Sequence, residues 1–196
     1  MPVRSRNCAV ILTYAVMVLD LPAQATFLMR NYVLNALDAP VFNYDGSRLF
    51  GSNYVAVLYG GPAFDVLYLA RENSLGYPLM TPVPLTHTVN GQGGYFYLGR
   101  DVLFFNVDCG GIAWLQVRVW DTELGATYEQ VAQLGLGGFG ESALFQKQGG
   151  APCRLPPTLP EPLIGLQSFS LVPEPSVWTL LALGGLAAWV GRRRHR

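Results

Sequence analysis

One stretch near the middle of the chain alternates strictly between aliphatic side chains and all other kinds. Within residues 113–120 the aliphatic positions are Ala113, Leu115, Val117 and Val119, and the positions between them are Trp114, Gln116, Arg118 and Trp120. A period of two predicts a strand whose aliphatic face lies on a core. Such a strand needs paired neighbours and a second layer over that face, so the rest of the chain has to provide both.

Other runs of β-branched and aromatic residues are separated by glycine and proline, which account for 22 and 14 of the 196 residues. We expect strands at residues 31–37, 52–59, 65–70, 95–98, 102–107, 127–132, 143–146 and 166–171, and a turn at Gly60-Gly61-Pro62. No stretch of residues 26–172 keeps a helical apolar period over three turns. The sequence therefore predicts an all-β fold, an antiparallel β-sandwich. An immunoglobulin-like arrangement is favoured and a jelly roll is the alternative.

A polar tripeptide, an apolar segment and a run of arginines follow one another in residues 173–196. Residues 176–191 carry no charge, and Arg192, Arg193, Arg194 and Arg196 come directly after them. The segment is apolar on all sides, which favours a transmembrane helix, although it is shorter than the ~20 residues that cross a bilayer comfortably. By the positive-inside rule the arginines stop transfer, so the chain before residue 173 is expected on the far side of the membrane.

Residues 1–25 show the three regions of a secretory signal peptide. Arg4 and Arg6 precede an apolar run at residues 8–19, and Ala23-Gln24-Ala25 supplies an A-x-A cleavage site. We expect cleavage after Ala25, because a permanent anchor would need a longer apolar run. The protein is then exported, crosses the inner membrane once before processing, and ends at the cell surface or outside the cell.

The order of these C-terminal parts resembles the PEP-CTERM sorting signal of exopolysaccharide-producing Gram-negative bacteria. The resemblance implies that Pro173, Glu174 and Pro175 are recognised by a membrane enzyme, an exosortase, that processes the chain near them. The tripeptide alone is not specific, since Pro160-Glu161-Pro162 has no apolar segment behind it. Residues 30–175 also resemble a recurring class of exported PEP-CTERM proteins, through motifs such as Val117-Arg118-Val119-Trp120-Asp121. That resemblance implies no activity.

These features divide the chain into four parts. Residues 1–25 are the signal peptide, 26–148 the exported β-sandwich, 149–172 a Pro-rich segment with the last strand, and 173–196 the sorting signal. Five prolines lie within residues 149–162, and this segment is expected to be a linker or to run along a sheet edge.

The exported part excludes several classes of function. Residues 26–172 hold seven of the 13 basic residues and 11 of the 13 acidic ones, a net charge near −4, which argues against nucleic acid as a partner. His87 is the only histidine among them, so neither a serine–histidine site nor a zinc site is expected. No catalytic, cofactor or metal site is predicted, and the protein is not expected to be an enzyme.

Two further features have alternative interpretations. Cys109 and Cys153 are expected to form a disulfide in an oxidising destination, and two free thiols are the alternative. Trp114 and Trp120 share one strand face. If that face is exposed, the two rings could stack on sugars; burial in a core is favoured because large aromatic side chains usually bury.

The sequence thus indicates an exported envelope or extracellular-matrix protein with a structural or adhesive role. Its expected partners are an exosortase, the membrane through the C-terminal helix, and exopolysaccharide. A carbohydrate-binding module for exopolysaccharide is the alternative function, followed by an extracellular hydrolase that acts through paired carboxylates.

Overall fold

The computed structural model describes residues 24–74 and 76–172. The expected signal peptide before Gln24, the sorting tripeptide, the segment 176–191 and the terminal arginines lie outside these residues. Within the described part of the chain, no helix has the length and hydropathy needed to cross a membrane.

The all-β prediction is confirmed, because the described residues form several sheets and one short helix. The elements are β1 (Ala25–Arg30), β2 (Tyr32–Val33), β3 (Leu37–Asp38), β4 (Val41–Phe42), β5 (Gly51–Ala63), β6 (Val66–Leu69), β7 (Arg71–Glu72), β8 (Val83–Leu85), β9 (His87–Val89), β10 (Gln92–Tyr95), β11 (Tyr97–Phe104), β12 (Ile112–Asp121), α1 (Tyr128–Leu134), β13 (Phe139–Glu141), β14 (Phe145–Gln148), β15 (Glu161–Pro162) and β16 (Phe169–Ser170).

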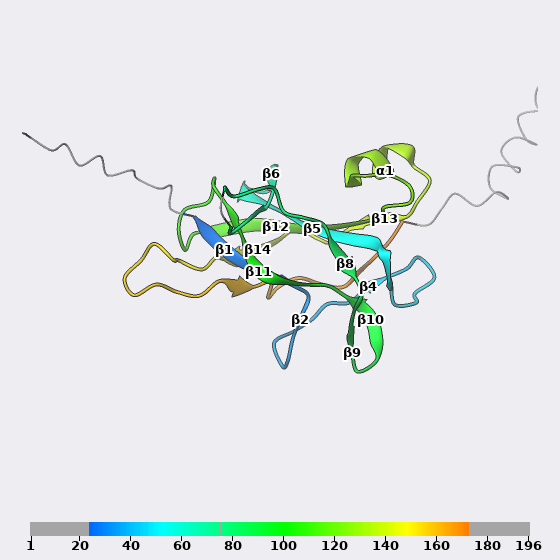
Figure 1. Ribbon diagram of the computed structural model, residues 1–196, viewed down its shortest axis with the longest axis horizontal. Coiled ribbons are helices and arrows are strands. Elements are labelled where there is room, and N and C mark those ends of the chain that lie inside the picture. The colour runs from blue at the N-terminus through cyan, green and yellow to red at the C-terminus, as the bar shows by residue number, and fades with distance from the viewer. Residues whose placement is uncertain (1–23, 75, 173–196) are drawn as a thin grey trace, which may run out of the picture.

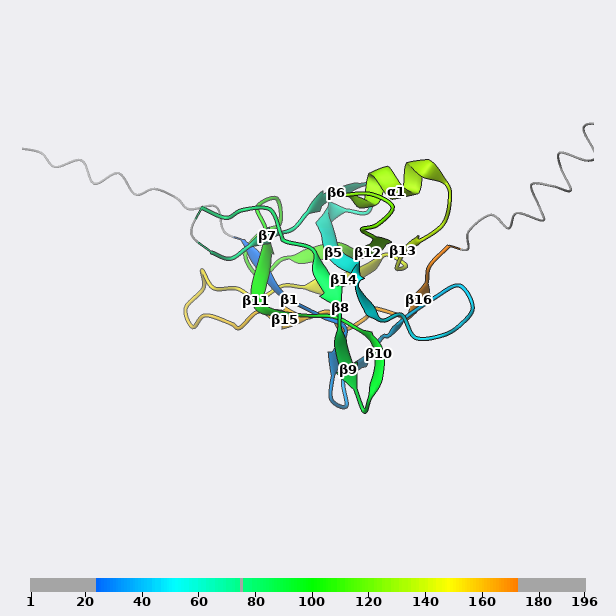
Figure 2. The same cartoon turned by 45° about the vertical axis from the view of Figure 1, so that its right-hand side comes forward.

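Two sheets form the body of the molecule. The larger has the order β13-β12-β5-β6, with β14 also paired to β12 and β8 to β5, and the smaller has the order β15-β1-β11-β7. The helix α1 lies on the outer side of the larger sheet, away from β11 (Figures 1 and 2). The expectation of purely antiparallel pairing is wrong at two places, since β15 runs parallel to β1 and β16 runs parallel to β4. Both pairs join segments far apart in sequence, so no hairpin dictates their direction.

The alternating stretch forms β12, and its aliphatic face is buried as predicted. Ala113, Leu115, Val117 and Val119 are all 0% exposed. The strand pairs with β5 in one unbroken antiparallel register from Trp114 opposite Gly61 to Asp121 opposite Tyr54. These two strands are therefore the longest continuous ladder in the described residues.

The expected turn at Gly60-Gly61-Pro62 is instead part of β5, which continues to Ala63. A Cβ at Gly60 would lie 2.7 Å from atoms of Phe104 in the other sheet and of Leu115 in the neighbouring strand. At Gly61 a Cβ would meet the carbonyl oxygen of Val66. Glycine is therefore needed at both positions because neighbouring atoms approach the backbone too closely for a side chain, which is a common reason for glycine inside a strand.

The strand expected at residues 127–132 is a helix, and local capping explains why. The Thr127 side chain accepts a hydrogen bond from the Gln130 N–H, and Gly135 ends the helix in the left-handed region at φ 65°. Between these caps lie mostly good helix formers. Seven residues are too few to show a helical period, so the capping pair was the available signal.

The strand expected at residues 31–37 is also wrong. Asn31 is 0% exposed, and its side chain donates to the carbonyl oxygens of Ala39 and Gly94 while it accepts from the Phe96 N–H. The chain then turns through the short β2–β3 hairpin. The buried amide satisfies backbone groups of three segments, which a continuing strand at this position would not do.

We predict that Gly60→Ala lowers the free energy of unfolding by about 1–3 kcal/mol, because its methyl group overpacks the space between the two sheets. Gly99→Ala is the matched control in β11, where a Cβ would meet nothing closer than 4.0 Å. Guanidinium unfolding followed by tryptophan fluorescence measures both. Equal midpoints for the two variants would contradict the packing at Gly60.

Candidate functional site

The chain leaves the described fold at one end of β12. The Leu171 N–H donates to Phe42 O at 3.0 Å and the Val172 N–H to Phe139 O at 2.7 Å, while the Gly138 N–H donates to Val172 O at 3.3 Å. Phe139 is itself opposite Trp120, near the end of β12. We call Leu171 and Val172 the junction. The expected tripeptide begins at the next residue of the sequence, directly after the last described residue.

The opposite end of β12 carries an exposed group of large apolar side chains. The Phe64 ring meets Trp114 edge-on at 6.0 Å, and Phe105 follows Phe104, which is paired with Ala25. Together, the distal apolar surface comprises Phe64, Val66, Tyr68, Leu79 and Phe105, all 39–61% exposed. The step from Trp114 to Trp120 along β12 separates the levels of this surface and the junction, and at strand rise these six steps span about 20 Å.

A groove of about 340 Å³ runs through the distal apolar surface. Tyr68, Leu79 and Phe105 line it together with Arg71 and Asn106. The Arg71 guanidinium lies 5.4 Å from the centre of the Phe105 ring and donates to the Tyr77 carbonyl oxygen. The groove thus combines aromatic faces with one cation and one amide.

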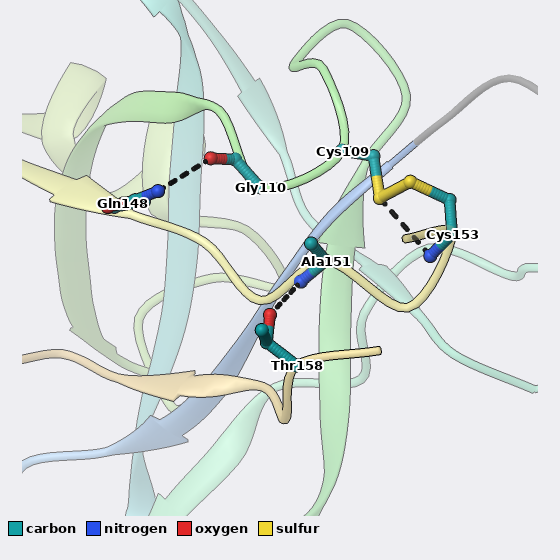
Figure 3. The surroundings of a disulfide bond; sticks show 6 residues. All are labelled: Cys109, Gly110, Gln148, Ala151, Cys153 and Thr158. Atoms are coloured by element: carbon teal, nitrogen blue, oxygen red, sulfur yellow. Dashed lines mark hydrogen bonds between the residues drawn. A yellow bond between two sulfur atoms is a disulfide. The ribbon is translucent and has the colours of Figure 1, made fainter. Parts of the chain in front are cut away.

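A disulfide joins Cys109 to Cys153 at this same end, as Figure 3 shows, with Cα atoms 6.3 Å apart. The Gln148 side chain donates to Gly110 O at 3.1 Å, and the Ala151 N–H donates to the Thr158 hydroxyl at 2.7 Å. The bridge therefore fixes the start of the Pro-rich segment beside the turn that precedes β12.

The Pro-rich segment then runs along a sheet edge, the second of the two arrangements expected for it. Gly150 exchanges two backbone hydrogen bonds with Thr26, and Glu161 in β15 lies opposite Phe27. Leu163, two residues after Glu161, is 0% exposed. Residues 149–172 thus contribute side chains to the core and cover the edge of β1.

Ala25 of the expected cleavage site is the first residue of β1. It is 0% exposed, and its N–H donates to Val107 O at 3.2 Å. Ala23, the other residue of the A-x-A site, lies outside the described residues. Cleavage after Ala25 would therefore have to precede the docking of β1.

A polar and aromatic cluster connects α1 to the outer face of β12. The Arg118 guanidinium lies 4.1 Å from the Tyr59 ring centre and 5.0 Å from that of Tyr128. It also approaches the carboxylates of Glu129 at 3.2 Å and Glu141 at 3.6 Å. The two tyrosines complete the cluster, since Tyr59 donates to Glu129 at 2.7 Å and Tyr128 to Glu141 at 3.2 Å.

The directions in which the pKa values of this cluster are shifted favour a structural role for it. Burial and the hydrogen bond to Glu129 raise the pKa of Tyr59 to about 12, and burial with the charge of Glu141 raises the pKa of Tyr128. Burial opposes ionisation of Glu129, but its hydrogen bond from Tyr59 and the Arg118 charge outweigh this and lower its pKa. A glycosidase acid needs a raised carboxyl pKa, so Glu129 is unsuited to that role.

The other side chains considered for catalysis or metal binding lie apart from one another. His87 is exposed, and its ring lies 6.0 Å from that of Tyr97. The buried Glu72 is paired with Arg100 at 2.7 Å, and the hydrogen bond from Thr81 lowers its pKa. Among the described residues, no group of three or more histidine, cysteine, aspartate or glutamate side chains is arranged to hold a metal ion.

The two tryptophans of β12 do not form an open platform. Trp120 is 3% exposed, and its indole N–H donates to Gly125 O at 3.2 Å, beneath the turn that leads into α1. Trp114 is half-buried against Phe64. The expected burial of this face therefore holds for Trp120, and the missed aromatic surface lies on β6 and the turn after β11.

The PEP-CTERM protein-sorting motif matches residues 171–194 of the chain. The match begins at the junction and includes Pro173, Glu174, Pro175 and three of the four expected stop-transfer arginines, while Arg196 lies beyond it. The predicted resemblance is confirmed, and the motif implies export, processing by an exosortase and anchoring of the C-terminal part in a membrane. Neither a curated protein nor a solved structure matches the chain.

We predict that replacing both Cys109 and Cys153 by alanine lowers the free energy of unfolding by about 3–4 kcal/mol, because the unfolded chain regains the freedom of a long loop. Guanidinium denaturation of the oxidised protein and of the variant measures the difference. Reduction of the unchanged protein is the control and should give the same loss. An unchanged midpoint in the variant would contradict a stabilising bridge.

Proposed function

We propose that this PEP-CTERM protein is a non-enzymatic structural or adhesive β-sandwich, which an exosortase releases from the inner membrane to the cell surface or the extracellular matrix. One observation carries the proposal: the junction and the distal apolar surface lie at opposite ends of β12. While the chain is anchored through its sorting signal, the exposed aromatic side chains would lie at the end of β12 that is farther from the junction.

The surface chemistry is consistent with adhesion. Phe64 and Tyr68 are 61% and 54% exposed, although large aromatic side chains usually bury. Contiguous exposed apolar groups of this kind mark interaction sites in soluble domains. The Cys109–Cys153 bridge lies at the same end, where it supports the loops that carry the surface in an oxidising environment.

Exopolysaccharide binding is the second candidate function, and the groove beside Phe105 favours it. Aromatic faces stack on sugar rings, and Arg71 and Asn106 add a cation and an amide within the same groove. The sequence offered an exposed Trp114/Trp120 platform only as the alternative to burial, and the groove lies apart from those two side chains. A hydrolase is not favoured, because the described carboxylates with shifted pKa values, Glu72 and Glu129 among them, have lowered ones.

We predict that Pro173→Ala/Glu174→Ala leaves export intact and blocks processing, because the recognition motif is lost while both membrane-directed segments remain. The measurement is the intact mass of the protein that is recovered from the envelope and the medium of an exosortase-bearing host. The variant should lack the first ~25 residues and keep its C-terminal segment.

The chain contains its own control for this experiment in Pro160→Ala/Glu161→Ala, which alters the same tripeptide without an apolar segment behind it. Glu161 makes one ion pair with Lys147 at 3.4 Å, and exposed pairs of this kind contribute only about 0–1 kcal/mol. The control variant should therefore fold and be processed. Processing of the Pro173/Glu174 variant would remove the proposed role of the motif.

We predict that Phe64→Ser/Tyr68→Ser leaves processing unchanged but shifts the protein from the extracellular polymer into the medium. Loss of two exposed rings should weaken retention on the order of tenfold, equivalent to about 1.4 kcal/mol. Leu34→Ser/Tyr44→Ser is the matched control, because these side chains are 72% and 60% exposed outside the distal apolar surface. If both variants are retained equally, adhesion does not use this surface.

A further inference from the structure

The junction leaves no flexible spacer before the sorting tripeptide. Leu171 is 4% exposed, and Val172 is held on both sides by its hydrogen bonds to Phe139 and Gly138. The expected apolar segment starts at Ser176, four residues later, and four extended residues span at most ~14 Å. The part of the domain around Gly138 must therefore lie within that distance of the point where the chain enters the membrane.

The end of α1 and the loop after it, which contacts the junction, have the composition of a membrane-facing surface. Residues 130–140 carry no charge. Leu134 and Leu136 are 53% and 50% exposed, and Val172, whose carbonyl oxygen accepts from the Gly138 N–H, is 43% exposed. Gly135 and Gly138 adopt positive φ values of 65° and 73°, so the loop turns back tightly while both leucines stay in solvent.

Two acidic residues lie at the side of this loop, while the Arg48 guanidinium lies 5.1 Å from the ring centre of Phe42, which bonds to Leu171. The Asp121 N–H donates to Gly138 O at 2.9 Å, and Glu123 is exposed two residues further on. Two carboxylates oppose an electrostatic attraction to anionic lipids. Contact with a bilayer would thus depend mainly on the aliphatic side chains.

We propose that Leu134, Leu136 and Val172 insert into the interfacial layer of the bilayer that holds the sorting signal, so that the domain rests on the membrane until it is processed. This inference depends on the membrane-anchored state in the proposed function. Resting on the bilayer would place Pro173 and the residues after it at the membrane surface, within reach of a membrane-embedded enzyme. Three aliphatic side chains hold a released domain only weakly, so processing also frees it.

Site-directed spin labelling of the full chain with its sorting signal tests this contact. Cys8 is replaced by serine, and a nitroxide is attached at Leu136→Cys or Leu134→Cys while Cys109 and Cys153 remain joined in the disulfide. Leu159→Cys is the matched control, since Leu159 is 83% exposed and its carbonyl lies beside Gly150, near β1. The protein is reconstituted in phosphatidylcholine vesicles, and collision rates with oxygen and with an aqueous nickel complex are compared with those in detergent.

We expect both loop labels to lose nickel collisions at least about fivefold and to gain oxygen collisions, with no change at the Leu159 site. Loop labels as open to nickel as the control, in chains that float with the vesicles, would overturn this inference alone. If the chains do not float with the vesicles, the sorting signal does not anchor them, and the membrane-anchored state in the proposed function is overturned. If the loop labels are protected from nickel only when exosortase is added, the loop contacts the enzyme rather than the bilayer, and the inference is overturned.

Discussion

The antiparallel ladder between β5 and β12 is the interaction on which the rest of the structure depends. Its unbroken register brings β6 and β8 to one strand, and β13 and β14 to the other. The ladder requires glycine at two places in β5, because Gly60 admits Phe104 from the other sheet and Gly61 admits the backbone of β6. A single pair of strands thus sets both the core and the separation between the junction and the distal apolar surface.

The Pro-rich segment in the second half of the chain covers the free edge of β1, the first strand. β1 pairs with β11 on one side, but its other edge is covered only when residues 149–162 return along it. The Cys109–Cys153 bridge places the start of that return, and Gly150 bonds to Thr26 at the next step. A two-residue strand pairing contributes little to stability by itself. The disulfide at the start of the Pro-rich segment therefore helps to hold that segment along the edge of β1.

The sequence predicted features encoded locally and missed those made by distant contacts. The face of β12 followed from its period of two, and the sorting signal from three parts in one order. The helix α1 was missed because seven residues show no period, although Thr127 and Gln130 offered a capping signal. Nothing local indicates that Asn31 bonds to Gly94 and Phe96, that β16 runs parallel to β4, or that Arg118 meets Glu129 and Glu141.

Placing the junction in the sheet has a consequence for processing. Leu171 is the last buried residue of the described chain, and its hydrogen bond to Phe42 joins β4 to the end of the domain. All core side chains of the described residues therefore precede Pro173, and cleavage near the tripeptide would leave those contacts in place. The hydrogen bonds of Val172 fix the last described residue against the sheet, one position before the tripeptide in the sequence. A short connection between a fixed residue and a recognised motif reduces the conformational entropy that recognition must overcome. The described core is therefore closed by residues that precede the sorting signal.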